Sequence, residues 1–525
     1  MSILQIKSIN QKQTISLIFL ISLSGFLIRL YFYPYDIPVS LDALDNFLYS
    51  MALARGDIFP DGYITNKFGW PIFLSPFLAI SWSHEMIDFM NIQRILSIII
   101  SVSTIIPLYY LTKNFFKKEI AIISSSLVVL SPKIIENSLL GIGDPLFLFL
   151  IIMSIMFVFI KDSKFYILSY IFGSFGFIVR QEGILILIPL ILVFVIKKNF
   201  DSKNFLKLGI GVFLFFAIIQ TADIILLNDV KDTSIFDTVI HAMNISEQEI
   251  IIKDDSVNEI GTITDNKFQF LKNALTTYFM LSGWTLFPNL IFFVILSIIV
   301  IRKKISKNRA IFLLFLIFLS LTSLFAYGKG IQEVRYLFPL IPIFGIFSCY
   351  GLNVIFLKIH KKLFLLLIPF VLFSGLIVEF TMHENLLQKE SFEDAKIVLQ
   401  YNATGINDYE QSKFVKSAAL FYNWPNLLPY GETRSVDPGV EKFPTADYTD
   451  INEYISQNQN EGLSHIVVYE KNNRLFLDEL YLNENKSSFL KKKGTLVTDD
   501  KKAFSNQIIT GISSTKNDAK VTMIG

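Results

Sequence analysis

Several kinds of residue are scarce in this sequence. Cys349 is the single cysteine of the 525-residue chain, so no disulfide can form within the chain and no cysteine–histidine metal cluster can be built. The five histidines are scattered, which argues against a His-rich zinc site. The formal net charge is only +2, and neither a basic arm nor a Gly-rich phosphate loop is visible. The sequence therefore indicates neither a nucleic-acid binder nor a nucleotide-binding domain.

Apolar residues, by contrast, are abundant. They make up 52% of the chain, and the mean hydropathy is +0.50. Many apolar runs are long enough to cross a bilayer, and we predict an α-helical polytopic membrane protein with about eleven transmembrane helices. The first run is longer than a signal-peptide core, so we interpret it as a retained span. The predicted spans are 13–33, 88–112, 119–135, 141–160, 165–181, 183–198, 205–227, 277–301, 310–327, 336–357 and 363–380.

The basic residues give the predicted orientation. With the N-terminus in the cytoplasm, every predicted inside loop is short and rich in Lys and Arg, as expected for loops that are not translocated. Two long loops, 34–87 and 228–276, then lie outside together with a polar tail. We therefore divide the chain into a membrane domain, 1–380, and a small extracytoplasmic α/β domain, 381–525. In this tail the strand-like pieces KSAALFY, LSHIVVYE and RLFLDELYL alternate with the helix-like YTDINEYISQNQ.

The outside loop 34–87 contains two stretches that predict interfacial helices. The first, VSLDALDNFLYSMALARG (39–56), has helical periodicity, with Asp42 and Asp45 away from its apolar stripe. An alternative interpretation is a surface helix whose acids are simply solvated. The second, NKFGWPIFLSPFLAISW (66–82), is apolar but short and broken by proline, as in an interfacial or re-entrant element. The apolar stripe of the first helix consists of Leu44, Phe47, Leu48 and Met51.

An outside aspartate soon after the first span, followed by a Pro-containing apolar helix, resembles the GT-C glycosyltransferases. These membrane enzymes use polyprenyl- or dolichyl-phosphate sugars. The chain is most similar to their protein O-mannosyltransferase-like and aminoarabinose-transferase-like branch, over most of residues 13–380. The other pieces that carry the resemblance, in order, are NIQRILSIIISVSTIIPLYYLTKNFF (91–116), SPKIIENSLLGIGDPLFLFL (131–150), VRQEGILILIPLIL (179–192) and EVRYLFPLIPI (333–343).

The resemblance implies roles for the acidic residues. In the family, the acid of the first outside loop acts as catalytic base or orients the acceptor, and this position is Asp42. The family pattern is often Asp-Glu, whereas Ala43 follows here, so Asp45, one turn on, is a candidate substitute. Asp144 matches another important acid of the family, although it would also suit a helix N-terminus. Asp36 is the runner-up for the base.

Sugar transfer from a lipid phosphate also requires cations that hold the departing phosphate. Lys67, Arg180, Lys329 and Arg335 fall in predicted outside loops or at outer helix ends, and we take them as phosphate-binding candidates. The alternative for each is a snorkelling interface residue, and for Arg180 an ion pair with Glu182 that joins two helices. We predict no metal ligands, and the need for a divalent cation stays open.

Together these features predict an inverting hexosyltransferase. It would move one sugar, with mannose the first candidate, from a polyprenyl- or dolichyl-phosphate donor to a protein or a lipid-linked glycan acceptor. Its other partners would be membrane lipids, and not nucleic acid. The composition favours the plasma membrane of a prokaryote, and an archaeon in particular. The alternatives are a secondary transporter, an inactive scaffold of the same fold, and an oligosaccharyltransferase. The Trp-Trp-Asp-Tyr-Gly motif of oligosaccharyltransferases is absent from the tail, and the candidate charges lie at outer helix ends rather than at mid-membrane.

Overall fold

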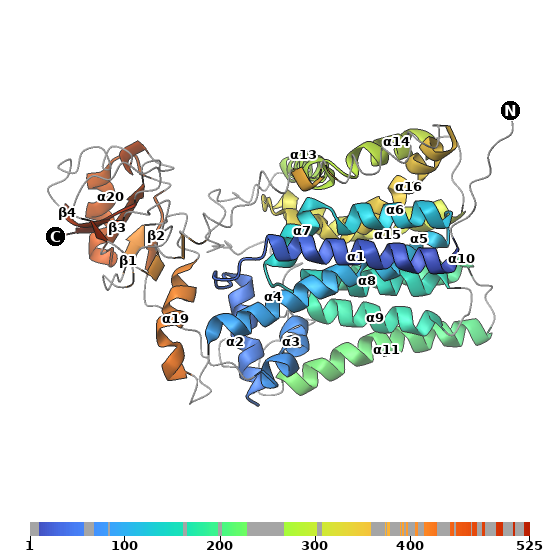
Figure 1. The fold of residues 1–525 in the computed structure, drawn as a ribbon, viewed down its shortest axis with the longest axis horizontal. Helices are drawn as coiled ribbons and strands as arrows, with labels where there is room; N and C mark the ends of the chain where they lie inside the picture. Colours follow the sequence, from blue (N-terminus) through green and yellow to red (C-terminus); the bar gives the residue numbers. More distant parts are fainter. Residues whose placement is uncertain are drawn as a thin grey trace.

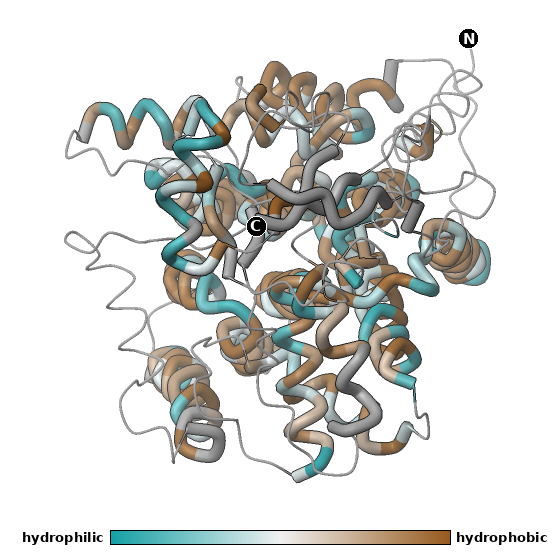
Figure 2. Tube along the Cα trace, turned by 90° about the vertical axis from the view of Figure 1, so that its left-hand side faces the viewer, coloured by the Kyte–Doolittle hydropathy of each residue, from teal (hydrophilic) through white to brown (hydrophobic). Residues whose placement is uncertain are grey.

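The computed structural model describes residues 10–56, 68–81, 85–160, 165–197, 202–227, 267–301 and 307–358, together with parts of 373–524. Long helices lie side by side in a bundle, several short helices gather at one of its ends, and the tail lies beyond that end (Figure 1). Figure 2 looks onto this end, and most bundle helices seen end-on there are coloured mainly as hydrophobic. The helices of the bundle are α1 (Gln11–Tyr31), α4 (Met86–Ser103), α5 (Ile105–Lys113), α6 (Lys118–Val129), α8 (Asp144–Phe159), α9 (Phe165–Val179), α10 (Leu187–Lys197), α11 (Ser202–Leu227), α13 (Lys267–Leu286), α14 (Ile291–Ile301), α15 (Lys307–Gly328) and α16 (Ile341–Lys358).

The chain is a multi-pass membrane protein by the length and composition of its helices. Five helices in the described residues are long and apolar enough to cross a membrane, or six if the bent pair α13–α14 counts as one span. Other apolar helices are shorter, at 10–17 residues. The short elements at the end of the bundle nearest the tail are α2 (Asp42–Ala54), α3 (Gly69–Ala79), α7 (Pro132–Leu139) and the 3-10 helices η1 (Gln181–Ile186) and η2 (Val334–Leu340).

The predicted spans between 13 and 357 fall on helices, with one correction. A single continuous span at 277–301 is wrong, because α13 begins ten residues earlier and meets α14 at a bend of 116°. Pro288 lies in the break, and proline supplies no backbone N–H to continue a helix. The predicted last span, 363–380, lies for the most part outside the described residues.

The described part of the tail contains a six-stranded mixed sheet of order β2-β1-β3-β6-β4-β5. LSHIVVYE forms β3 and YTDINEYISQNQ forms α20, as predicted, whereas KSAALFY lies within helix α19 and Leu475–Leu477 of RLFLDELYL are helical. Periodicity in such short apolar pieces does not separate a strand from a helix. The elements are β1 (Gly405–Asn407), α19 (Val415–Leu427), β2 (Glu441–Phe443), α20 (Ile451–Asn458), η4 (Gln459–Glu461), β3 (His465–Tyr469), β4 (Leu490–Leu496), β5 (Ile508–Ile509) and β6 (Ala519–Ile524).

Helix α2 is held between the bundle and the tail. Its predicted apolar stripe is buried, and α2 packs against α3. From the tail, Leu420 of α19 is buried in the same apolar cluster, and the Ser417 hydroxyl donates a hydrogen bond of 2.7 Å to the Val39 carbonyl. Figure 1 shows α19 beside α2 at this end of the bundle. The first turn of α2 is therefore fixed from both sides.

Candidate functional site

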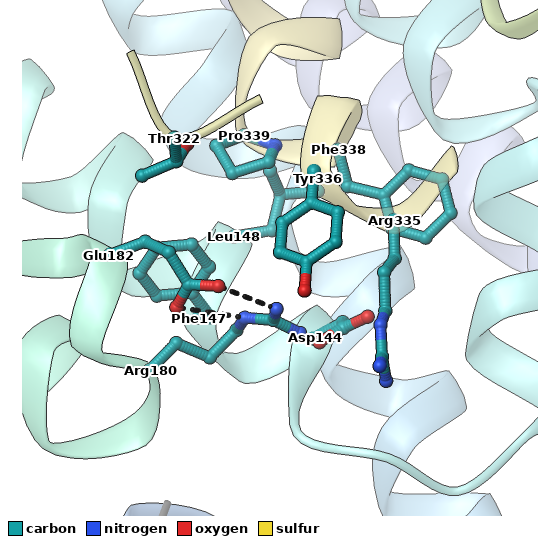
Figure 3. A pocket seen from close by; sticks show the side chains of 10 residues that line it. All are labelled: Asp144, Phe147, Leu148, Arg180, Glu182, Thr322, Arg335, Tyr336, Phe338 and Pro339. Atoms are coloured by element: carbon teal, nitrogen blue, oxygen red, sulfur yellow. Dashed lines mark hydrogen bonds and ion pairs between the residues drawn. The ribbon is translucent and has the colours of Figure 1, made fainter. Parts of the chain in front are cut away.

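A cavity opens where four elements meet at the end of the bundle that carries α2. The N-terminus of α8, the turn from α9 into η1, the C-terminal half of α15 and the start of η2 line it, and it is partly open to solvent. Figure 3 shows two arginines, two carboxylates and the Tyr336 hydroxyl on its polar side, with aromatic and proline side chains opposite. The lining residues are Asp144, Phe147, Leu148, Arg180, Glu182, Thr322, Arg335, Tyr336, Phe338 and Pro339.

Arg335 joins the cavity to helix α2. Its Nη1 donates to the Asp42 carboxylate, so that two residues 293 positions apart in the sequence are in contact. Its Nε and Nη2 face the Glu333 carboxylate, with 3.2 Å between Nη2 and Oε1. The side chain of Asp42 is 44% exposed, and those of Arg335 and Glu333 are each 22% exposed. This cluster is thus partly open to water.

Arg180 forms a second and more closed cluster. Its Nη1 donates to the Asp144 carboxylate, and its Nη2 donates to Glu182 over 2.8 Å. Asn137 of α7 donates to the other Asp144 oxygen at 3.1 Å. Burial alone would lower the pKa of the Arg180 guanidinium, but the charges and hydrogen bonds of Asp144 and Glu182 outweigh it and raise that pKa well above its usual value. Arg180 is therefore a permanent cation held between two carboxylates.

The two clusters lie close enough for their charges to interact. The charges of Arg180 and of Asp144 both act on the Arg335 guanidinium. Four carboxylates and two guanidiniums thus gather at one end of the bundle, and each guanidinium is bound by two carboxylates. Within the described residues, no group of three or more His, Cys, Asp or Glu side chains could hold a metal ion. An anion can bind here by taking the place of one carboxylate on a guanidinium.

Two buried polar side chains of α4 fix the backbone around Asp42. Arg94 donates to the carbonyls of Pro34, Ile37 and Pro38. The Gln93 amide donates to the Ala43 carbonyl at 2.9 Å and to the Gly141 carbonyl at 2.7 Å. Because Ala43 follows Asp42 and Gly141 lies three residues before Asp144, Gln93 ties the two acid-bearing turns together.

The residue before Asp42 has an unusual backbone. Leu41 has φ of +51°, and it is the one non-glycine residue with positive φ in the described part of the chain. A backbone of this kind costs of order 1–3 kcal/mol and persists only where the surroundings impose it. It turns the chain sharply into α2, so that Asp42 and Asp45 occupy the first helical turn, where negative charge is favoured.

The turn from α9 into η1 leaves no room for a side chain at Gly183, which gives a testable prediction. A Cβ at this position would lie 2.6 Å from the Phe177 nitrogen and 2.7 Å from the Phe177 Cα, which are backbone atoms that cannot move aside cheaply. Gly183→Ala should therefore displace η1 and lower the stability by roughly 1–3 kcal/mol. Thermal unfolding in detergent measures this, and Gly209→Ala in α11 is the matched control, since nothing lies within 4 Å of a Cβ there. Equal melting temperatures for the two variants would contradict the prediction.

The structure brings together four of the predicted site residues and separates the others. Asp42, Asp144, Arg180 and Arg335 belong to the two clusters described above. Asp45 is exposed on the first turn of α2 and does not line the cavity.

Three candidates lie elsewhere. Lys329 places its ammonium over the Phe325 ring, 4.5 Å from the centroid, and partial burial lowers its pKa. Asp36, the runner-up base, pairs with Lys389 at 3.0 Å and is 72% exposed. Lys67 lies outside the described residues.

Two polar residues at or beside the cavity were not predicted from the sequence. Glu333 binds Arg335, and the Tyr336 hydroxyl points into the cavity (Figure 3). The spacing of Glu333 could have identified it, because Glu-x-Arg at 333–335 is the reverse of Arg-x-Glu at 180–182. A carboxylate two residues from an arginine at the end of a span is a recognisable pairing pattern.

Comparisons with known proteins agree with this architecture. Residues 77–222 match the sequence model of the dolichyl-phosphate-mannose-protein mannosyltransferase family. No curated protein sequence matches the chain.

Two solved structures have the same fold. One is ArnT from Cupriavidus metallidurans bound to undecaprenyl phosphate, with a TM-score of 0.52 and 11% identity over 98% of each chain. The other is the apo oligosaccharyltransferase of Archaeoglobus fulgidus, with a TM-score of 0.53 and 12% identity over 88% of this chain and 70% of that one. The chain therefore has the fold of the GT-C membrane glycosyltransferases, as its sequence predicted.

Proposed function

We propose that this chain with a GT-C fold transfers a single sugar from a polyprenyl-phosphate carrier to an acceptor at the outer face of the membrane. The observation that carries the proposal is the contact between Asp42 and Arg335 beside the cavity. It places a carboxylate able to accept a proton next to a guanidinium able to hold a phosphate. The match to a mannosyltransferase family model supports mannose as the sugar and a protein hydroxyl as the acceptor.

The proposed reaction divides the work between these groups. Asp42 takes the proton of the acceptor hydroxyl, and the acceptor oxygen attacks the anomeric carbon of the sugar from the side opposite the phosphate. The bond between that carbon and the phosphate oxygen breaks, and the polyprenyl phosphate departs with the electron pair while Arg335 binds its negative charge. The configuration at the anomeric carbon is inverted. Because phosphate is a good leaving group, this scheme requires no strong general acid.

The basic residues support the proposed orientation. The turn from α5 into α6 carries Lys113, Lys117 and Lys118, and it lies at the end of the bundle opposite α2 and the tail (Figure 1). Lys197 ends α10 at that same end. Short basic loops stay in the cytoplasm, which would place the cavity and the tail outside. A prokaryotic plasma membrane remains our proposal for the location.

The donor class can be tested directly. Purified full-length protein in lipid nanodiscs would be given three radiolabelled donors: a polyprenyl-phosphate mannose, a polyprenyl-diphosphate oligosaccharide and a nucleotide-linked mannose. We expect transfer to Ser- and Thr-containing peptides from the monophosphate donor alone. Transfer from the diphosphate oligosaccharide would instead favour the oligosaccharyltransferase interpretation. An absence of transfer from every donor, by protein shown to be folded, would contradict the proposal.

A further inference from the structure

The two arginines of the site differ in how readily a ligand could reach them. The side chains of Arg180 and Asp144 are 9% and 7% exposed, so their ion pair is almost sealed. The side chains of Arg335 and Asp42 are 22% and 44% exposed, so their ion pair faces solvent at the cavity. Breaking a buried ion pair is costly, whereas a partly exposed pair contributes little. An incoming anion will therefore replace a carboxylate on Arg335 and leave the ion pairs of Arg180 intact.

The N–H donors of Arg335 are divided between the carboxylates of Asp42 and Glu333. Glu333 occupies the edge formed by Nε and Nη2, while Asp42 takes Nη1. A guanidinium offers a second edge, formed by Nη1 and Nη2, that suits two phosphate oxygens. A phosphate that binds this edge contacts Nη1, the same nitrogen that donates to Asp42. Glu333 can keep its own edge meanwhile and hold the guanidinium in place.

The contact between Asp42 and Arg335 conflicts with the proposed role of Asp42 as the base, and displacement of Asp42 by a phosphate removes the conflict. A carboxylate bound to a guanidinium is stabilised in its charged form, which makes it a poor proton acceptor. Asp42 therefore cannot serve well as a base while it binds Arg335. Once a phosphate takes its place, Asp42 loses its cation and gains an anion as its neighbour, and both changes make it more basic.

We propose that the donor phosphate and Asp42 compete for Arg335, so that donor binding itself releases the catalytic base. Glu333 is then a positioning residue, which holds the Arg335 guanidinium during the exchange. This inference rests on the proposed function, because it assumes a phosphate-bearing donor at this site. Under this coupling, the base becomes active only when the donor is bound.

Binding of undecaprenyl phosphate without any sugar tests the competition. The assay uses full-length protein in nanodiscs and measures the dissociation constant for wild type, Asp42→Asn and Asp36→Asn. We expect Asp42→Asn to bind the lipid phosphate roughly 2- to 5-fold more tightly, since one partly exposed ion pair no longer opposes binding. The same variant should fail to transfer sugar. Tighter binding together with lost transfer is a combination that a merely disrupted site would not produce.

Asp36→Asn is the matched control. It removes one negative charge from the same loop, but from a carboxylate that pairs with Lys389 rather than with Arg335. Its affinity for undecaprenyl phosphate should equal that of wild type. If both variants bind more tightly by the same factor, general charge repulsion explains the result and the competition is refuted. Unchanged or weaker binding by Asp42→Asn also refutes it.

Arg335→Met separates this inference from the proposed function. If wild type binds undecaprenyl phosphate, Arg335→Met binds it more weakly and Asp42→Asn is not tighter, the function stands and only the competition fails. If Arg335→Met binds as well as wild type, the phosphate does not use this site, and the proposed function and the inference fail together.

Discussion

Replacing Asp42 by asparagine is expected to lower the rate of sugar transfer by roughly 10²- to 10⁴-fold, the usual contribution of a general base. Asparagine has nearly the same size and can still accept a hydrogen bond from Arg335, but it cannot take a proton at neutral pH. Because the Asp42 side chain is 44% exposed, the replacement should leave the fold intact. A transfer assay with saturating polyprenyl-phosphate sugar measures the change as a loss of kcat.

Two further variants test whether the loss of transfer is specific to the removal of the Asp42 carboxylate. Asp36→Asn should transfer sugar at close to the wild-type rate, because Asp36 lies on the surface beside Lys389. Asp144→Asn should lose activity together with stability, since Asp144 is a buried partner of Arg180. Full transfer by Asp42→Asn combined with no transfer by a well-folded Asp36→Asn or Asp144→Asn would assign the base elsewhere.

Replacing Arg180 by methionine is expected to be the most destabilising single change at the site. The Arg180 side chain is 9% exposed, and its removal leaves the buried carboxylate of Asp144 and the partly buried carboxylate of Glu182 without their cation. Breaking a buried ion pair in this way typically costs about 3–5 kcal/mol. The measurement is the free energy of unfolding in mixed micelles, or the thermal midpoint if unfolding is not reversible.

Arg335→Met is the matched comparison, because it removes the same group from the more exposed cluster. It should lower the free energy of unfolding by about 1 kcal/mol or less while abolishing transfer. Adding Asp144→Asn and Glu182→Gln to Arg180→Met should restore much of the lost stability, since no buried charge then remains uncompensated. If Arg180→Met and Arg335→Met lose equal stability, the division into a closed and an open cluster is wrong.

Much of the fold could be predicted from the sequence, because the bilayer imposes long apolar runs that are easy to detect. The amphipathic helix α2 followed from the spacing of Phe47 and its apolar neighbours, and their burial confirms it. The bend between α13 and α14 was missed, because the residues around Pro288 are as apolar as a continuous span would be. In the tail, KSAALFY was predicted to be a strand but lies in a helix, because a short apolar piece fits the periodicity of a strand and of a helix equally well.

The site was predictable only as a set of candidates. Charged residues at helix ends in an apolar chain are conspicuous, so Asp42, Asp144, Arg180 and Arg335 could be singled out. Which of them touch depends on how distant helices pack, and nothing in local spacing predicts a contact across 293 residues. Likewise, sequence patterns do not show that each guanidinium is shared by two carboxylates, and the proposed competition depends on this sharing.

The measurement that tests this account most directly is a cryo-EM structure of the wild-type protein in nanodiscs with bound polyprenyl phosphate. The account predicts phosphate density on the Nη1–Nη2 edge of Arg335, with Glu333 still on the Nε–Nη2 edge and Asp42 turned away from Arg335 toward the cavity. Phosphate density away from Arg335, with the contact between Asp42 and Arg335 unbroken, would contradict it.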